Sequence, residues 1–105
     1  KAEYKPEFNT QTGEFLKDYA LITVRPGVTN DSTVMVLAGI KSEGTQAAAE
    51  FVTQKEYLDI LNQRLTQILA GGRPKYFQVL LGVDVDNGIP TTISILALHQ
   101  LAVTR

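Results

Sequence analysis

The chain has 105 residues, of which 44% are hydrophobic and 20% are charged, and its formal net charge at pH 7 is −1. Length and composition are those of one globular domain with its own core. The basic residues are scattered, which argues against direct nucleic-acid binding. No apolar run approaches the roughly 20 residues of a membrane-spanning helix, and neither a signal-peptide pattern nor a cysteine is present. We therefore expect no membrane partner, no disulfide and a cytoplasmic location.

The sequence begins at Lys1 and not at a methionine. This start indicates a fragment of a longer protein or a processed product. We expect residues 1–105 to form a single domain of a longer protein, whose function lies partly outside this segment.

Three strands are predicted in the N-terminal third of the chain. The first two, Tyr4–Phe8 and Phe15–Val24, are joined by the turn-forming run Asn9–Gly13. The third, Thr33–Ala38, is apolar without interruption, which is typical of a central strand with both faces covered.

Two helices follow, over Gln46–Val52 and Gln54–Leu69. Thr53 and Glu56 have the spacing of a capping box for the second helix, and the segment Gly71–Pro74 is expected to end it. One face of the second helix carries an apolar stripe, formed by Leu58, Leu61, Leu65, Ile68 and Leu69.

The C-terminal third predicts a β-hairpin. Strands Tyr76–Asp86 and Pro90–Leu101 flank the turn signal Asn87-Gly88, and apolar residues alternate with polar ones in the first of them. His99 continues the alternation of Ile93, Ile95 and Ala97, so we expect a hydrogen-bonded histidine at the edge of the core.

The predicted fold is therefore α/β (mixed α+β) with the order β-β-β-α-α-β-β. The third strand, the helices and the strand from Tyr76 make one right-handed crossover between parallel strands of a mixed sheet. Only one helical excursion is available, whereas several strands carry apolar residues toward both faces. We expect the uncovered face to meet a second copy in a homodimer, or the missing N-terminal region of the same protein.

The most site-like feature is the glycine loop between the third strand and the first helix. Gly39 and Gly44 have the spacing of a phosphate-binding loop, but no lysine precedes Thr45, which argues against NTP hydrolysis. Backbone amides at the start of the helix can still hold a phosphate or nucleotide. The alternative is that Gly44 only permits the turn and Thr45 caps the helix. The candidate ligand-binding residues are Gly39, Ser42, Gly44, Thr45, Gln46 and, from a neighbouring strand edge, Asp18.

The sequence contains no recognisable catalytic set. Asp84 and Asp86 share one face of a strand but lie beside a hairpin turn, where aspartates are common. A single histidine leaves no histidine cluster for a metal. We assign no catalytic residue, metal or cofactor.

Four segments resemble the C-terminal region of a group of uncharacterised bacterial proteins that is frequent in acidobacteria. They are Asp18–Ile22, Val36–Ile40, Gly44–Thr53 and Tyr76–Leu81. The resemblance extends from about Tyr4 to Leu98 and implies an upstream region, in some members a winged-helix regulator. The glycine loop is also similar to those of Rossmann-like nucleotide-sensing domains, which implies that Gly39, Gly44 and Thr45 line a ligand.

Two functional hypotheses follow. The first is a ligand-sensing or regulatory domain that binds an anion or nucleotide at the Gly39–Thr45 loop. The second is a protein–protein interaction or dimerisation module without a small-molecule ligand. An enzyme that acts on a nucleotide is a third, less favoured hypothesis.

Overall fold

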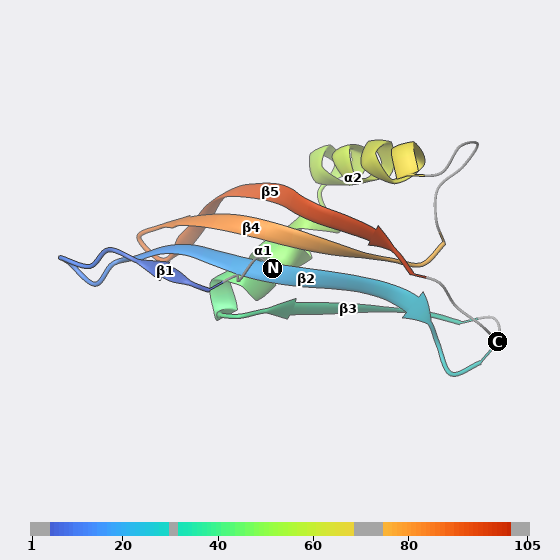
Figure 1. Cartoon of the computed structure of the whole chain (residues 1–105), viewed down its shortest axis with the longest axis horizontal. Coiled ribbons are helices and arrows are strands. Elements are labelled where there is room, and N and C mark those ends of the chain that lie inside the picture. The colour runs from blue at the N-terminus through green and yellow to red at the C-terminus, as the bar shows by residue number, and fades with distance from the viewer. Residues whose placement is uncertain (1–4, 30–31, 69–74, 102–105) are drawn as a thin grey trace.

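The computed structural model describes residues 5–29, 32–68 and 75–101, with the side chain of Ile68 excluded. These residues form five strands and two helices, in the predicted order (Figure 1). The strands are β1 (Glu7–Phe8), β2 (Phe15–Pro26), β3 (Thr33–Gly39), β4 (Phe77–Asp86) and β5 (Ile89–Gln100). The helices are α1 (Ser42–Phe51) and α2 (Lys55–Ile68).

The sheet is antiparallel at every described strand pair. β2 pairs with β4 along one edge and β4 pairs with β5, while β1 and β3 both pair with the other edge of β2. The prediction of a mixed sheet is therefore wrong. β3 and β4 run in the same direction, but β2 lies between them and is antiparallel to both. The handedness of the connection stays a prediction.

β3 is an edge strand among the described residues, so the prediction of a central, doubly covered strand is also wrong. Met35 and Val36 are 50% and 41% exposed. An unbroken apolar run indicates burial on both faces only when strands pair on both sides, and pairing is a long-range property that the run itself does not encode.

Both helices pack against one face of the sheet, which we call the inner face. It presents alternate residues of β2 and β4, including Ile22, Val79 and Leu81, to Ala48 and Phe51 of α1 and to Leu61 and Leu65 of α2. Ala47 and Ala48 are fully buried, because their small side chains let α1 approach the sheet closely. The ring of Phe51 stacks on Tyr57 with 5.3 Å between centroids and thereby joins the two helices.

The helix boundaries differ from the prediction in two places. α1 begins at Ser42 and not at Gln46, so four residues of the predicted loop form its first turn. Thr53 does not form the predicted capping box, since its hydroxyl donates instead to the carbonyl of Ala49 at 2.8 Å. The predicted stop signals of the second helix, Gly71–Pro74, lie outside the described residues.

β4 and β5 are connected by Asn87-Gly88, and both residues have positive φ, 51° and 75°. These angles suit a two-residue turn that follows the twist of the paired strands. The register between β4 and β5 shifts next to Leu80 and next to Asp84. At each shift β5 has one extra residue, Leu96 at the first and Thr91 at the second. After the first of these bulges Ala97 and His99 lie opposite Leu80 and Gln78, whose side chains point away from the helices. His99 is exposed, so its predicted position at the edge of the core is wrong.

Candidate functional site

The glycine loop is far tighter than the sequence indicates. Only Ile40 and Lys41 separate β3 from α1. A Cβ atom at Gly39 would overlap the amide nitrogen of Thr45, and one at Gly44 would lie 2.7 Å from the carbonyl oxygen of Tyr19. Both glycines are therefore required by close backbone contact between β2, β3 and the start of α1.

The amides at the start of α1 are bound by a carboxylate of the protein itself. Asp18 is fully buried, and its Oδ2 accepts hydrogen bonds from the amides of Lys41 at 2.9 Å and Gly44 at 2.7 Å. Its Oδ1 accepts a third, from the amide of Tyr19 at 2.8 Å. The positive end of a helix and its unpaired amides attract an anion. In this fold Asp18 supplies that anion.

The other predicted site residues lie at the end of β3 (Gly39) and in the first residues of α1 (Ser42, Gly44, Thr45 and Gln46). Thr45 is exposed, and its hydroxyl accepts a hydrogen bond from the amide of Gly39 at 3.0 Å, so it does not cap α1 as the alternative prediction proposed. The hydroxyl of Ser42 donates to the carboxylate of Glu43 at 3.2 Å, and Gln46 is exposed. Access of an external phosphate to the amide of Gly44 requires displacement of Asp18.

The sequence predicted that Asp18 lies near the glycine loop, but as a side chain exposed to solvent. The sequence did contain a signal for its burial. Asp18 lies two residues before Ala20 and therefore shares one face of β2 with Ala20, Ile22 and Val24. All four side chains face inward. A charged residue on a buried face must have partners, and here the partners are amides.

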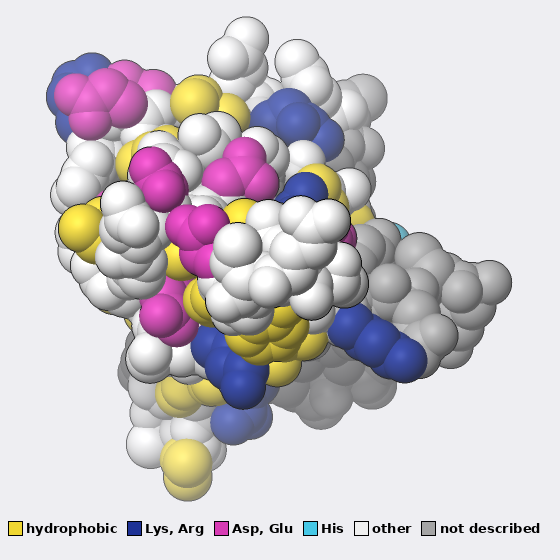
Figure 2. All heavy atoms as spheres, turned by 90° about the vertical axis from the view of Figure 1, so that its left-hand side faces the viewer, with side chains coloured by type: hydrophobic (Ala, Val, Ile, Leu, Met, Phe, Trp, Pro, Cys, Tyr) yellow, Lys and Arg dark blue, Asp and Glu magenta, His cyan; other side chains and the backbone are white. Residues whose placement is uncertain are grey.

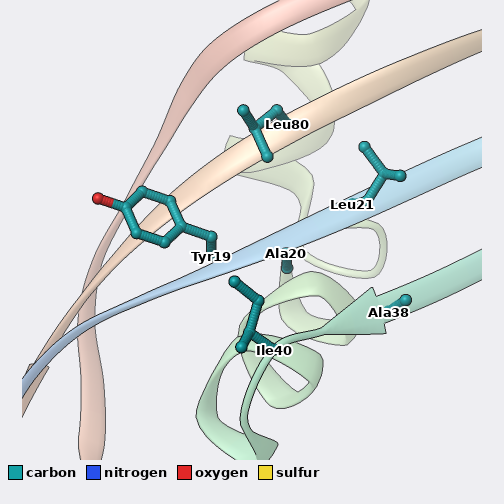
Figure 3. A pocket seen from close by; sticks show the side chains of 6 residues that line it. All are labelled: Tyr19, Ala20, Leu21, Ala38, Ile40 and Leu80. Carbon is teal, nitrogen blue, oxygen red and sulfur yellow. The ribbon is translucent and has the colours of Figure 1, made fainter. Parts of the chain in front are cut away.

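A second candidate site lies on the sheet face opposite the helices, which we call the open face. It contains a hollow of about 100 Å³ lined by Tyr19, Ala20, Leu21, Ala38, Ile40 and Leu80 (Figure 3). Leu21 and Leu80 lie opposite each other on neighbouring strands, and Ala38 lies opposite Leu21 on β3. The hydroxyl of Tyr19 donates to the carboxylate of Glu7 at 3.2 Å. The lining is thus almost entirely apolar.

Exposed apolar side chains continue this surface beyond the hollow. Outside it, Val36 and Leu96 are each 41% exposed, and Ile40, which lines the hollow, is 51% exposed. Leu96 occupies the bulge of β5 and covers Gly82, where a Cβ would lie 3.0 Å from its Cδ1. The bulge therefore adds a large apolar residue to the open face.

Acidic side chains gather at the end of the molecule that carries β1 and the β4–β5 turn (Figure 2). Glu7, Asp84 and Asp86 are exposed there. Within the described ranges, no three histidine, cysteine or acidic residues are placed to hold a metal ion. Among the residues that the structure describes, neither α1 nor α2 is long and apolar enough to cross a membrane.

No family model matches the chain, and comparisons with curated proteins and with solved structures gave no match either. The resemblance to acidobacterial proteins therefore rests on the sequence segments alone.

Proposed function

We propose that this domain is a protein–protein interaction module whose binding surface is the open face of the sheet. The observation that carries the proposal is the hollow bordered by Leu21, Ala38 and Leu80 on a face that neither helix covers. Contiguous exposed apolar surface on a folded domain is characteristic of an interaction site.

The size and chemistry of the hollow favour an apolar side chain of a protein over a small molecule. Small-molecule pockets usually enclose about 300–1,000 Å³ and include a few convergent polar groups. The hollow has about 100 Å³, less than the roughly 150 Å³ of an apolar cavity that takes up benzene. One leucine or isoleucine side chain of a partner could fill a hollow of this size, and buried apolar anchors of this kind dominate the energetics of interfaces.

Anion or nucleotide sensing at the Gly39–Thr45 loop ranks second. Asp18 already accepts hydrogen bonds from the amides of Lys41 and Gly44. A phosphate would have to displace a buried carboxylate that accepts three hydrogen bonds, and that exchange has a large desolvation cost.

Selection from a random peptide library against the purified domain tests the proposal. Enriched peptides are expected to contain an apolar anchor residue and to bind the folded domain. Leu80→Glu places a charge in the hollow and should weaken their binding at least tenfold, measured by fluorescence anisotropy.

Gln63→Glu is the matched control, because it adds the same charge at an exposed position of α2. It should leave peptide affinity unchanged. Equal affinity of the selected peptides for the wild type and for Leu80→Glu would contradict the open face as the binding surface.

A further inference from the structure

The two long edges of the sheet differ in how they are protected against pairing with another strand. β5 carries Pro90 and two register shifts, which are common devices against edge-to-edge association. β3 has the sequence TVMVLAG, with no charge and no proline, and its pairing with β2 continues without a register shift. An uncharged, regular, apolar edge strand is a template for another strand.

The backbone of β3 shows which groups point outward. The amide of Ile40 donates to the carbonyl of Tyr19 on β2 at 3.0 Å. Because successive residues of a strand direct their backbone groups to opposite sides, Leu37 and Met35 point theirs away from β2. The amide of Gly39 also points away from β2, and the Thr45 hydroxyl accepts its hydrogen bond. Leu37 and Met35 therefore offer donors and acceptors at an edge where no described strand pairs.

We propose that β3 is a dimerisation edge, on which β3 of a second copy pairs antiparallel about a two-fold axis at Val36. In this register Met35 of each copy exchanges hydrogen bonds with Leu37 of the other, which gives about four new backbone hydrogen bonds. An antiparallel pair of identical strands is self-complementary under a two-fold axis.

The side chains fit this register on both faces. Val36 meets Val36 of the second copy on the open face, Val34 meets Ala38 there, and Met35 meets Leu37 on the inner face. These three pairs are apolar, Thr33 faces Gly39 at the ends of the strand, and no like charges are opposed. The pairing also accounts for the high exposure of Met35 and Val36, at 50% and 41%, in the single chain.

A two-fold axis of this kind is perpendicular to the sheet, so both open faces lie on the same side of the dimer. The dimer rests on the proposed function in one respect only: if the open face binds a partner, the open faces of the two copies together form one larger binding surface. Pairing along the edge does not involve Leu80, which belongs to β4, two strands away from the axis.

Sedimentation equilibrium between about 5 and 500 µM tests the pairing. The wild type is expected to form a dimer. Met35→Pro removes the outward amide without removing a hydrogen bond to β2, and it should weaken dimerisation at least tenfold.

Val36→Lys and Val36→Glu provide a second test that does not depend on proline. Each variant alone opposes like charges at the two-fold axis and should be monomeric. An equimolar mixture should regain the dimer, because opposite charges then face each other. Thermal unfolding followed by circular dichroism verifies that each variant is folded.

A wild type that stays monomeric at all concentrations would overturn the pairing, and so would a dimer that survives Met35→Pro and gains nothing from the charge mixture. A dimer lost in Leu80→Glu but kept in Met35→Pro would mean that the copies stack through their open faces. The peptide measurement is independent of these results, since Leu80→Glu affects the hollow and Met35→Pro affects the edge.

Discussion

The carboxylate of Asp18 and the amide of Gly44 form a 2.7 Å hydrogen bond that joins β2 to the start of α1. A side chain at Gly44 would occupy the same space, because its Cβ would lie 2.6 Å from the bonded oxygen. The glycine therefore lets a buried carboxylate reach the helix amides. The relationship gives the Gly39–Thr45 segment a structural role within the folded chain.

Gly44→Ala should destabilise the domain. The new methyl group would overlap the Asp18 carboxylate and the Tyr19 carbonyl, and overpacking of this kind costs about 1–3 kcal/mol. Urea unfolding measures the free energy of unfolding. Gln46→Ala is the control on the same helix, because the side chain is exposed and alanine favours helix, and it should change stability by less than about 0.5 kcal/mol. A fully stable Gly44→Ala variant would show that the contact relaxes without cost.

Asp18→Ala should also destabilise the domain, in this case by removing hydrogen bonds and not by overpacking. It leaves the amides of Tyr19, Lys41 and Gly44 without their acceptor in a buried site, and the expected loss is about 3 kcal/mol or more. The loss should be visible as a lower urea midpoint without a change in slope. Asp18→Asn retains an acceptor oxygen and should lie between the wild type and Asp18→Ala.

The Asp18→Ala variant also tests whether the start of α1 can bind an external anion. Millimolar phosphate, compared with sodium chloride at equal ionic strength, should raise the melting temperature of Asp18→Ala by filling the vacated position. It should leave the wild type unchanged. A saturable rise for the wild type with phosphate or a nucleotide would instead favour the Gly39–Thr45 loop as a ligand site despite Asp18.

The packing of α2 can be tested with two residues on the same helix. Leu65 is fully buried in the core between α2 and the sheet, whereas Ile60 is 47% exposed. Leu65→Ala should cost about 2–5 kcal/mol through lost burial and the cavity left behind. Ile60→Ala should cost less than about 1 kcal/mol. Similar losses for both variants, measured by urea unfolding, would be incompatible with this orientation of α2.

Lys55 and Asp59 form an exposed ion pair one helical turn apart, with 2.7 Å between Nζ and Oδ2. The hydrogen bond and the charge of Asp59 raise the pKa of Lys55 above its ordinary value of 10.5. The stabilisation is therefore complete below that value and is lost as the pH rises through the raised pKa of the folded state. An NMR titration of the Lys55 side chain should show the pKa falling in Asp59→Asn. No change in that variant would mean that the pair does not persist in solution.

Local patterns in the sequence predicted the order of strands and helices. Alternation in Phe77–Asp86 follows from a strand with one covered face, and the spacing of Leu61 and Leu65 follows from a helix packed on one side. These signals depend on neighbours a few residues apart. The start of α1 was missed because Gly44 is uncommon within a helix, and only its contact with Asp18 explains its presence there.

The candidate sites depended on contacts between distant segments. Asp18 and Gly44 are 26 positions apart, and no local pattern shows that a strand carboxylate binds the amides of a helix. The bulge at Leu96 changes which face the following residues of β5 occupy, so the sequence alternation placed His99 on the wrong side.

By itself, the sequence determined the number and order of the elements, because hydrophobic periodicity and turn residues act over short distances. Tertiary structure decided that β2 separates β3 from β4, that Asp18 occupies the helix start, and which apolar residues remain on the open face. Strand partners are chosen by the packing of the whole chain, and the same apolar strand can lie at the centre of a sheet or at its edge.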